Sequence, residues 1–252
     1  MVNAVYGFTS ILLRIIRELK PDYILSIDDD NIPDEDYFTT WHRVLTDPVA
    51  QEAATDSSDQ TASWHNYLKT ADAPFELFPR GFPIPFRQKS ATSVRPCLPV
   101  LASAIGLFQG ISLGDPDIDA MTRLVFPKPL PLNAIAEKNY VLKNVWSPYN
   151  MQNTMYAPDL FGLPVLWPHV GRLDDIYASY AFQQLLFMKN RYVFVGDPVN
   201  RQDRGQRDTL NTDFREEVDE YRRMHDVWEI IRSIDATEPT RIQHTIDLLS
   251  VR

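Results

Sequence analysis

The sequence has one cysteine and no long apolar run, and each shortage excludes a class of protein. Cys97 is the single cysteine, so no disulfide can form within the chain. We interpret it as a small buried residue and not a catalytic thiol, because no histidine is paired with it locally. No apolar run approaches the ~20 residues of a membrane-spanning helix, and the sequence shows no cleavable signal peptide or Asn-x-Ser/Thr sequon. We therefore expect a cytoplasmic or other soluble intracellular protein, with no transmembrane segment in this chain.

Positive charge is also scarce. The chain has 25 lysines and arginines against 34 acidic residues, which gives a net charge of -9 and a pI near 5.0. This balance argues against nucleic acid or an anionic membrane as a partner. It still allows local phosphate binding through a metal ion and a few arginines. A length of 252 residues, 44% of them hydrophobic, can form one globular domain with a sizeable core.

Expected strands and helices alternate along the chain, which predicts the α/β class. We expect helices over 3–20, 34–45, 173–188 and 212–234, the last capped by Thr212 or Asp213. We expect strands over 24–27, within 98–108, and over 140–145, 164–167 and 192–195. Residues 51–63 and 200–211 should be exposed, and the proline-rich segment 75–86 should not be helical. The expected organisation is one domain over 1–252, with 200–252 as a charged loop and helical extension.

The most informative segment is an apolar run, 24–27, that ends in Asp28, Asp29 and Asp30. Three adjacent carboxylates repel one another unless a cation lies between them. Mg²⁺ and Mn²⁺ prefer carboxylate and phosphate oxygens, so the triplet fits a metal that carries a diphosphate. An EF-hand loop fails because Ile32 stands where an acidic or amide side chain is needed and Pro33 stands where glycine is needed. A prenyl-diphosphate site would place its acids on a helix. A solvated acidic turn remains the alternative.

Two further clusters have the composition of a sugar-nucleotide site. Residues 78–87 hold Arg80 and Arg87 in a stiff, proline-rich backbone, and arginine suits bidentate phosphate recognition. The alternative is the edge of a core with outward-pointing arginines. Residues 147–156 combine amides with aromatic rings, which match sugar hydroxyls and sugar faces. Ordinary turn residues would give the same composition.

Residues 171–177 hold two adjacent acids, Asp174 and Asp175, at the start of an expected helix. The helix dipole alone would favour them there, as caps. Alternatively, one of them orients or deprotonates an acceptor hydroxyl. His169 lies close by and would be either a metal ligand or, as we favour, a structural histidine.

In this order the motifs resemble those of the reversibly glycosylated polypeptides, also called UDP-arabinopyranose mutases, and even more those of the STELLO family of glycosyltransferase-like proteins. The resemblance covers most of the chain, and five weak motifs in one order are fairly specific together. The matching segments are 26–30, 79–83 with Arg87, 116–119, 150–154 and 172–177, followed by the last helix over 213–228.

The resemblance implies a GT-A-like fold, a mixed sheet flanked by helices that binds a nucleotide-diphosphate sugar. It gives Asp28, Asp29 and Asp30 the role of holding Mn²⁺ or Mg²⁺. It puts Arg87 where the mutases have the arginine that becomes glycosylated, and Asp174 and Asp175 near the acceptor. The remaining expected substrate-binding residues are Arg80, Asp117, Asp119, Asn150, Gln152, Asn153 and Arg172.

The sequence departs from these families in two places. Only about one helix precedes Asp28, so we expect the first nucleotide-binding strand of a GT-A fold to be missing from this sequence, either because the chain is truncated at its N-terminus or because the protein binds nucleotide incompletely. We also expect no membrane anchor of the STELLO type in this chain, so a Golgi location would need a longer parent chain that carries it. Residues 152–154 follow STELLO and not the mutases, which argues against mutase activity.

The sequence therefore predicts a metal-dependent glycosyltransferase-like enzyme with a UDP-sugar donor, in which the metal would neutralise the leaving diphosphate and Asp175 would orient or deprotonate the acceptor. Its acceptor would be a glycan, a protein or a small molecule, and a homo-oligomer is compatible with the sequence. One alternative is a mutase or self-glycosylating protein that acts through Arg87. Another is a non-catalytic scaffold that keeps the fold.

Overall fold

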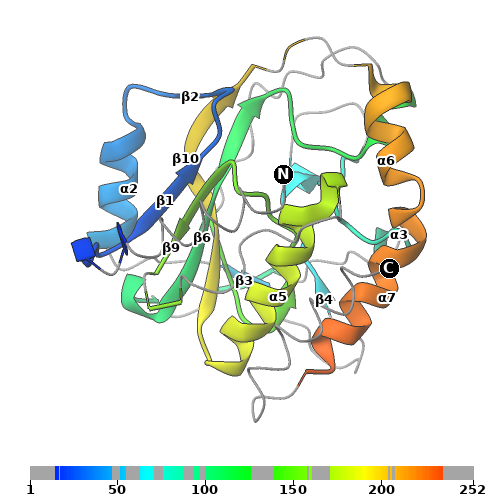
Figure 1. Ribbon diagram of the computed structural model, residues 1–252. Coiled ribbons are helices and arrows are strands. Elements are labelled where there is room, and N and C mark those ends of the chain that lie inside the picture. Colours follow the sequence, from blue (N-terminus) through cyan, green and yellow to red (C-terminus); the bar gives the residue numbers. More distant parts are fainter. Residues whose placement is uncertain are drawn as a thin grey trace.

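A mixed β-sheet forms the centre of the fold, and helices cover both of its faces (Figure 1). The computed structural model describes residues 15–16, 18–46, 52–54, 63–70, 76–87, 94–96, 100–125, 139–157, 159–160, 171–203, 205 and 208–234. Within these residues no helix is both long and apolar enough to cross a membrane.

Eight strands make up the main sheet, in the order β1-β9-β6-β10-β7-β3-β5, with β2 paired to the end of β10. Its two longest strands, β6 and β10, run parallel at the centre, whereas β9 is antiparallel to both β1 and β6. A separate pair joins β4 and β8. The strands are β1 Ile24–Ile27, β2 Asn31–Pro33, β3 Glu52–Ala54, β4 Ser63–Trp64, β5 Val94–Pro96, β6 Ile105–Gly114, β7 Tyr140–Leu142, β8 Val145–Trp146, β9 Asn153–Tyr156 and β10 Tyr192–Gln202.

The helices are mostly short, and only three of the described ones reach ten residues or more. The α-helices are α2 Tyr37–Thr46, α3 Ile84–Arg87, α4 Ala120–Val125, α5 Asp174–Met188, α6 Arg215–Glu217 and α7 Glu220–Arg232. Single turns are η1 Tyr67–Thr70, η2 Ala102–Ala104 and η3 Gly171–Leu173, and the π-helical turn η4 Thr209–Phe214 precedes α6.

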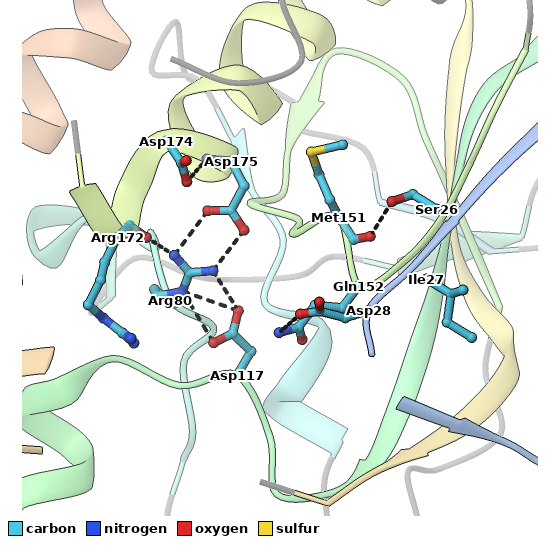
Figure 2. A pocket seen from close by; sticks show the side chains of 10 residues that line it. All are labelled: Ser26, Ile27, Asp28, Arg80, Asp117, Met151, Gln152, Arg172, Asp174 and Asp175. Atoms are coloured by element: carbon cyan, nitrogen blue, oxygen red, sulfur yellow. Dashed lines mark hydrogen bonds and ion pairs between the residues drawn. The ribbon is translucent and has the colours of Figure 1, made fainter. Parts of the chain in front are cut away.

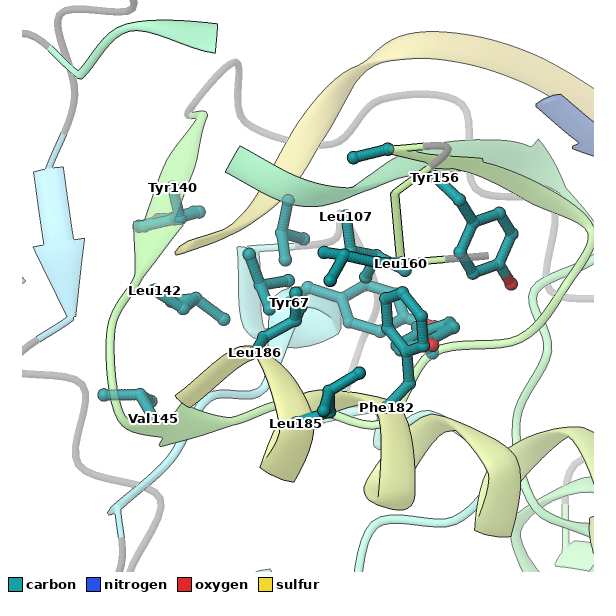
Figure 3. Close-up of a cluster of buried hydrophobic side chains, with 14 of the residues drawn as sticks. Tyr67, Leu107, Tyr140, Leu142, Val145, Tyr156, Leu160, Phe182, Leu185 and Leu186 are labelled. Carbon is teal, nitrogen blue, oxygen red and sulfur yellow. The ribbon is translucent and has the colours of Figure 1, made fainter. Parts of the chain in front are cut away.

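Successive side chains of the central strands point to opposite faces of the sheet and pack in two different hydrophobic cores. In β10, Val193 and Val195 pack in the cluster that contains α5, whereas Phe194 packs in the cluster that contains α2. This is the period of two expected of a strand covered on both faces. Figure 3 shows Phe182 and Leu185 of α5 directed into the first of these cores.

Helix α5 is buried between the sheet and α7. Ten of its fifteen residues are buried, so it has no single apolar stripe. Its other side packs on an aromatic cluster in which Trp64, Trp146 and Trp228 contact one another. Because Trp228 belongs to α7, the end of the described chain forms part of the core.

The α/β class and a mixed sheet flanked by helices are confirmed, and the helices expected within the described residues lie close to their expected places. The strands differ more. Strand β3 forms inside the expected loop 51–63, because it pairs with β5 and β7, and β9 forms inside the amide-rich segment, because it pairs with β1 and β6. Strand β6 continues past the expected limit of residue 108 to Gly114.

Three further details differ. Strand β10 continues to Gln202, because its end pairs with both β6 and β2, so Asn200 and Gln202 are buried and not exposed. Asp208 accepts the hydrogen bond that caps the last helical segment, in place of Thr212 or Asp213. Residues 84–87 of the proline-rich segment form a short helix, which tolerates Pro85 in its first turn.

Several expectations fall outside the described residues: strand 164–167, His169, Cys97 and most of helix 3–20, of which residues 15–16 and 18–19 are helical.

Candidate functional site

The candidate site lies where three strands end at one edge of the sheet. Strands β6 and β10 are parallel, and β1 runs in the same direction because β9 is antiparallel to both β1 and β6. Their carboxyl ends therefore meet, which is the usual position of a ligand site in α/β sheets. The residues that follow β1 and β6 include Asp28 and Asp117, respectively.

The acid triplet is the first component of the site. Carboxylate oxygens of Asp28, Asp29 and Asp30 all lie within 4.8 Å of one another. Asp30 is fixed at two points, because its Oδ1 accepts hydrogen bonds from Gln202 Nε2 at 3.2 Å and Asn31 Nδ2 at 3.3 Å. Asp29 is exposed. Three carboxylates at this spacing are a donor set that suits a hard divalent cation such as Mg²⁺ or Mn²⁺.

A pocket of about 350 Å³ opens beside the triplet (Figure 2). It is lined by residues from five separate segments of the chain: Ser26, Ile27, Asp28, Arg80, Asp117, Met151, Gln152, Arg172, Asp174 and Asp175. Ser26, Ile27 and Met151 lie in the matching segments 26–30 and 150–154 but were not among the expected site residues. Ser26 Oγ donates to the Met151 carbonyl at 2.7 Å, which joins β1 to the loop before β9.

A buried arginine forms one wall of the pocket. Arg80 Nε and Nη2 donate to Asp117, and Nη1 and Nη2 donate to Asp175 at 3.0 and 2.7 Å (Figure 2). The second proton of Nη1 is directed to the Arg172 carbonyl. A guanidinium has five N–H donors, and here all five are engaged within the protein. Arg80, expected to bind the donor, therefore orients two carboxylates instead of presenting free donors to a ligand.

Two carboxylates from η4 and α6 form ion pairs with Arg172. Its Nε lies 3.0 Å from Glu217 Oε1 and its Nη1 2.8 Å from Asp213 Oδ1. Glu217 also accepts hydrogen bonds from the Ala120 amide at 2.8 Å and the Tyr221 hydroxyl at 2.8 Å. The only sequence signal of this role is the spacing of four between Asp213 and Glu217, which places both on one helix face.

The two adjacent acids of α5 lie in different surroundings. Burial, and then the charge of Asp175, raises the pKa of Asp174 to about 6. Burial also raises the pKa of Asp175, and this rise is opposed by the Arg80 guanidinium. Asp174 Oδ1 accepts the Asp175 amide at 2.7 Å at the helix N-terminus.

The amide-rich loop braces the acids on both sides of the pocket. Asn150 Nδ2 donates to Asp117 Oδ2 at 2.8 Å and to Gln152 Oε1 at 3.0 Å. Gln152 Nε2 in turn lies 3.4 Å from Asp28 Oδ2. One chain of side chains thus connects the triplet with the Arg80 wall. Gln152 lines the pocket, and Asn150 supports it from behind.

Three of the expected site residues lie elsewhere. Arg87 Nη2 pairs with Asp119 Oδ2 at 2.9 Å, and its guanidinium lies 5.1 Å from the centre of the Phe78 ring. Neither member of this pair lines the pocket. Asn153 is fully buried in β9, where it accepts a hydrogen bond from the Tyr37 hydroxyl at 2.6 Å. It fastens α2 to the sheet.

The described fold and site define a mixed α/β protein with an acid-lined pocket at the carboxyl edge of its sheet. No family model matches the sequence, and a search of the curated proteins gives no match either. The likeness to the STELLO proteins and the mutases therefore stays a prediction made from motifs.

Proposed function

We propose that this chain is a metal-dependent glycosyltransferase-like protein that uses a nucleotide-diphosphate sugar, with a UDP-sugar as the expected donor. The observation that carries the proposal is a shared pocket: Asp28 of the acid triplet and Asp174 and Asp175 of α5 line the same cavity. A donor held at the triplet would place its sugar next to two carboxylates that can orient an acceptor.

The charge of the pocket supports a metal at the triplet. Four of the ten lining residues are aspartates, and the two arginines among them are already paired with carboxylates. Without a cation, such a pocket repels a diphosphate. Asp28, Asp29 and Asp30 would hold Mn²⁺ or Mg²⁺, and the bound ion would neutralise the charge that develops on the leaving diphosphate.

The chain's own residues would do the remaining work. Arg80 keeps Asp117 and Asp175 in fixed orientations, and carboxylate oxygens accept hydrogen bonds from sugar hydroxyls. Gln152 offers an amide beside Asp28. Arg87 has no part in this proposal, because it is paired with Asp119 outside the pocket.

Calorimetric titration of UDP with and without Mn²⁺ tests the proposal. We expect binding that requires Mn²⁺ and weakens at least about tenfold in the double variant Asp28→Asn/Asp30→Asn. The matched control is Glu35→Gln/Asp36→Asn, which removes two exposed acids from the same stretch of chain and should bind like the wild type. Absence of Mn²⁺-dependent binding would contradict the proposal and favour a non-catalytic scaffold.

A further inference from the structure

We propose that the two acids of α5 have separate roles, with Asp174 as the proton acceptor for the attacking hydroxyl and Asp175 as a positioning residue. This inference rests on the proposed function and adds to it. The hypothesis made from the sequence gave Asp175 the role of orienting or deprotonating the acceptor, although residue type and spacing do not separate two adjacent aspartates. Their surroundings in the fold differ.

Both oxygens of Asp175 are engaged. Oδ1 accepts Arg80 Nη1 at 3.0 Å and the Ile176 amide at 2.9 Å, and Oδ2 accepts Arg80 Nη2 at 2.7 Å. A proton placed on either oxygen would displace an N–H donor from a buried ion pair, which is costly. Asp175 is therefore poorly suited to accept a proton during a reaction.

Only one of the two carboxylate oxygens of Asp174 is engaged by a described residue. Its Oδ1 accepts the Asp175 amide, while its Oδ2 has no partner among the described residues. The side chain is half-buried and lines the pocket. A carboxylate with a free oxygen at a cavity wall meets the geometric requirement for a general base, which must reach the proton that it takes.

The electrostatics of the pocket favour the same assignment. Burial and the charge of Asp175 raise the pKa of Asp174 to about 6, while Arg80 opposes the rise. A carboxylate that titrates close to the working pH is a stronger base than one with an ordinary pKa, and is still ionised near neutrality. The charged groups that line the pocket with it are Asp175 on its own helix, Arg172 in the preceding turn, Arg80, Asp117, and Asp28 after β1.

The reaction that we propose transfers the sugar from the nucleoside diphosphate to the acceptor with inversion at the anomeric carbon. The O–H bond of the acceptor breaks and its proton passes to Asp174 Oδ2. The acceptor oxygen then forms the new bond to the anomeric carbon, as the bond between that carbon and the diphosphate oxygen breaks. The nucleoside diphosphate leaves with the bonding electron pair.

The test uses the full chain with Mn²⁺ and a panel of UDP-sugars: UDP-glucose, UDP-galactose, UDP-xylose and UDP-N-acetylglucosamine. UDP release to water or to added sugar acceptors is measured against pH. We expect Asp174→Asn to lower kcat at least about 100-fold, with Mn²⁺-dependent UDP affinity changed only a few fold. Asp174→Glu should recover part of the rate and shift the acidic limb of the pH profile, which a merely structural role would not do.

Asp175→Asn should raise KM as well as lower kcat, because it loosens the Arg80 wall. Asp219→Asn, the same change at the exposed start of α7, is the matched control and should behave like the wild type. Wild-type turnover that Asp174→Asn leaves intact would overturn this inference alone. A wild type that releases no UDP from any sugar of the panel would overturn both the inference and the proposed function.

Discussion

Arg80 is the residue on which the pocket wall depends. It is nine-tenths buried, its partner Asp117 is more deeply buried still, and its partner Asp175 is almost as buried. Burying charge is costly unless it is paired and hydrogen-bonded. Arg80 meets that condition, because each of its N–H groups has an acceptor. Its replacement would leave two buried carboxylates facing each other.

We predict that Arg80→Met costs about 3–5 kcal/mol of unfolding free energy, because it breaks a buried ion-pair network on one side. Urea denaturation at neutral pH measures the loss. Arg80→Lys keeps the charge but has three donors in place of five, so its loss should be smaller yet still clear. The control is Arg223→Met: Arg223 is 61% exposed in its pair with Glu220, and such pairs contribute about 0–1 kcal/mol. Equal losses at both positions would contradict the role of Arg80.

The raised pKa of Asp174 also predicts how stability depends on pH. Its pKa is about 6 in the folded chain and near the ordinary value of about 4 when unfolded. Between these values the folded state binds more protons, so this group makes the protein less stable as the pH rises from about 4 to 6. We predict that Asp174→Asn is more stable than the wild type by about 1–2 kcal/mol above that range, after allowance for partial exposure.

Urea denaturation across this pH range measures the Asp174 effect, with Asp219→Asn again as the exposed control. The gain should disappear toward the low end of the range, where Asp174 is protonated and uncharged in both states. A gain that is the same at every pH would show that the substitution acts through packing and not through charge.

At the scale of elements, the site depends on a close approach between the Arg80 turn and α5. Gly81 has a φ of +85°, and a Cβ there would lie 2.2 Å from Ile176 Cγ2. The Gly81 carbonyl also accepts a hydrogen bond from the Tyr180 hydroxyl of α5. Glycine is therefore required twice, for its backbone conformation and for the space that it leaves.

We predict that Gly81→Ala destabilises the protein by about 2–4 kcal/mol, since it combines backbone strain with overpacking. It should also weaken Mn²⁺-dependent UDP binding by moving Arg80 away from Asp175. Thermal unfolding and calorimetry measure the two effects. Gly205→Ala is the matched control, because nothing lies within 4 Å of a Cβ at that position. If the two variants unfold alike, the contact between the turn and α5 is not what holds the wall.

A helix or strand could be predicted where the residues of that element themselves carry the pattern. The strand 24–27 follows from its apolar run and from the acids that end it, and α5 follows from a start at Asp174 and a long apolar stretch. The end of β10 was not predictable, because its polar residues are buried through pairing with β6 on one side and with β2, over 160 residues earlier in the chain, on the other. Local composition cannot reveal a polar strand whose amides bond to each other.

For the site too, residue types could be predicted from the sequence, whereas contacts between distant segments could not. Asp28, Arg80, Gln152, Asp174 and Asp175 were candidates from their residue types and spacing, and Asp117 and Arg172 from the resemblance. The fold brings all seven to one pocket. Their partners could not be predicted. Arg80 and Asp175 are 95 residues apart, and Arg172 and Glu217 are 45 apart. Which arginine pairs with which acid depends on tertiary packing, as does the exclusion of Arg87 from the pocket.

At the scale of the whole molecule, the acid triplet concentrates three acidic side chains at one point of a protein whose net charge is -9. Holding three carboxylates within 4.8 Å in the folded state adds repulsion to the overall negative charge. A divalent cation that binds there removes repulsion from the folded state. Because the three acids are contiguous in sequence, the unfolded chain also attracts the cation, though without the fixed geometry provided by Gln202 and Asn31.

We therefore predict that Mn²⁺ stabilises the whole protein. Binding to the folded state alone adds about 2.7 kcal/mol at about 100 times Kd, and binding to the unfolded chain reduces this gain. For a chain of this size the gain corresponds to a rise in Tm of a few degrees, up to about 10 °C. Calorimetric unfolding with Mn²⁺ measures it, with equal ionic strength supplied by NaCl as the reference. Asp28→Asn/Asp30→Asn should lose the rise while Glu35→Gln/Asp36→Asn keeps it. If all three proteins respond alike, Mn²⁺ acts by general screening of the negative charge and the triplet is only a solvated acidic turn.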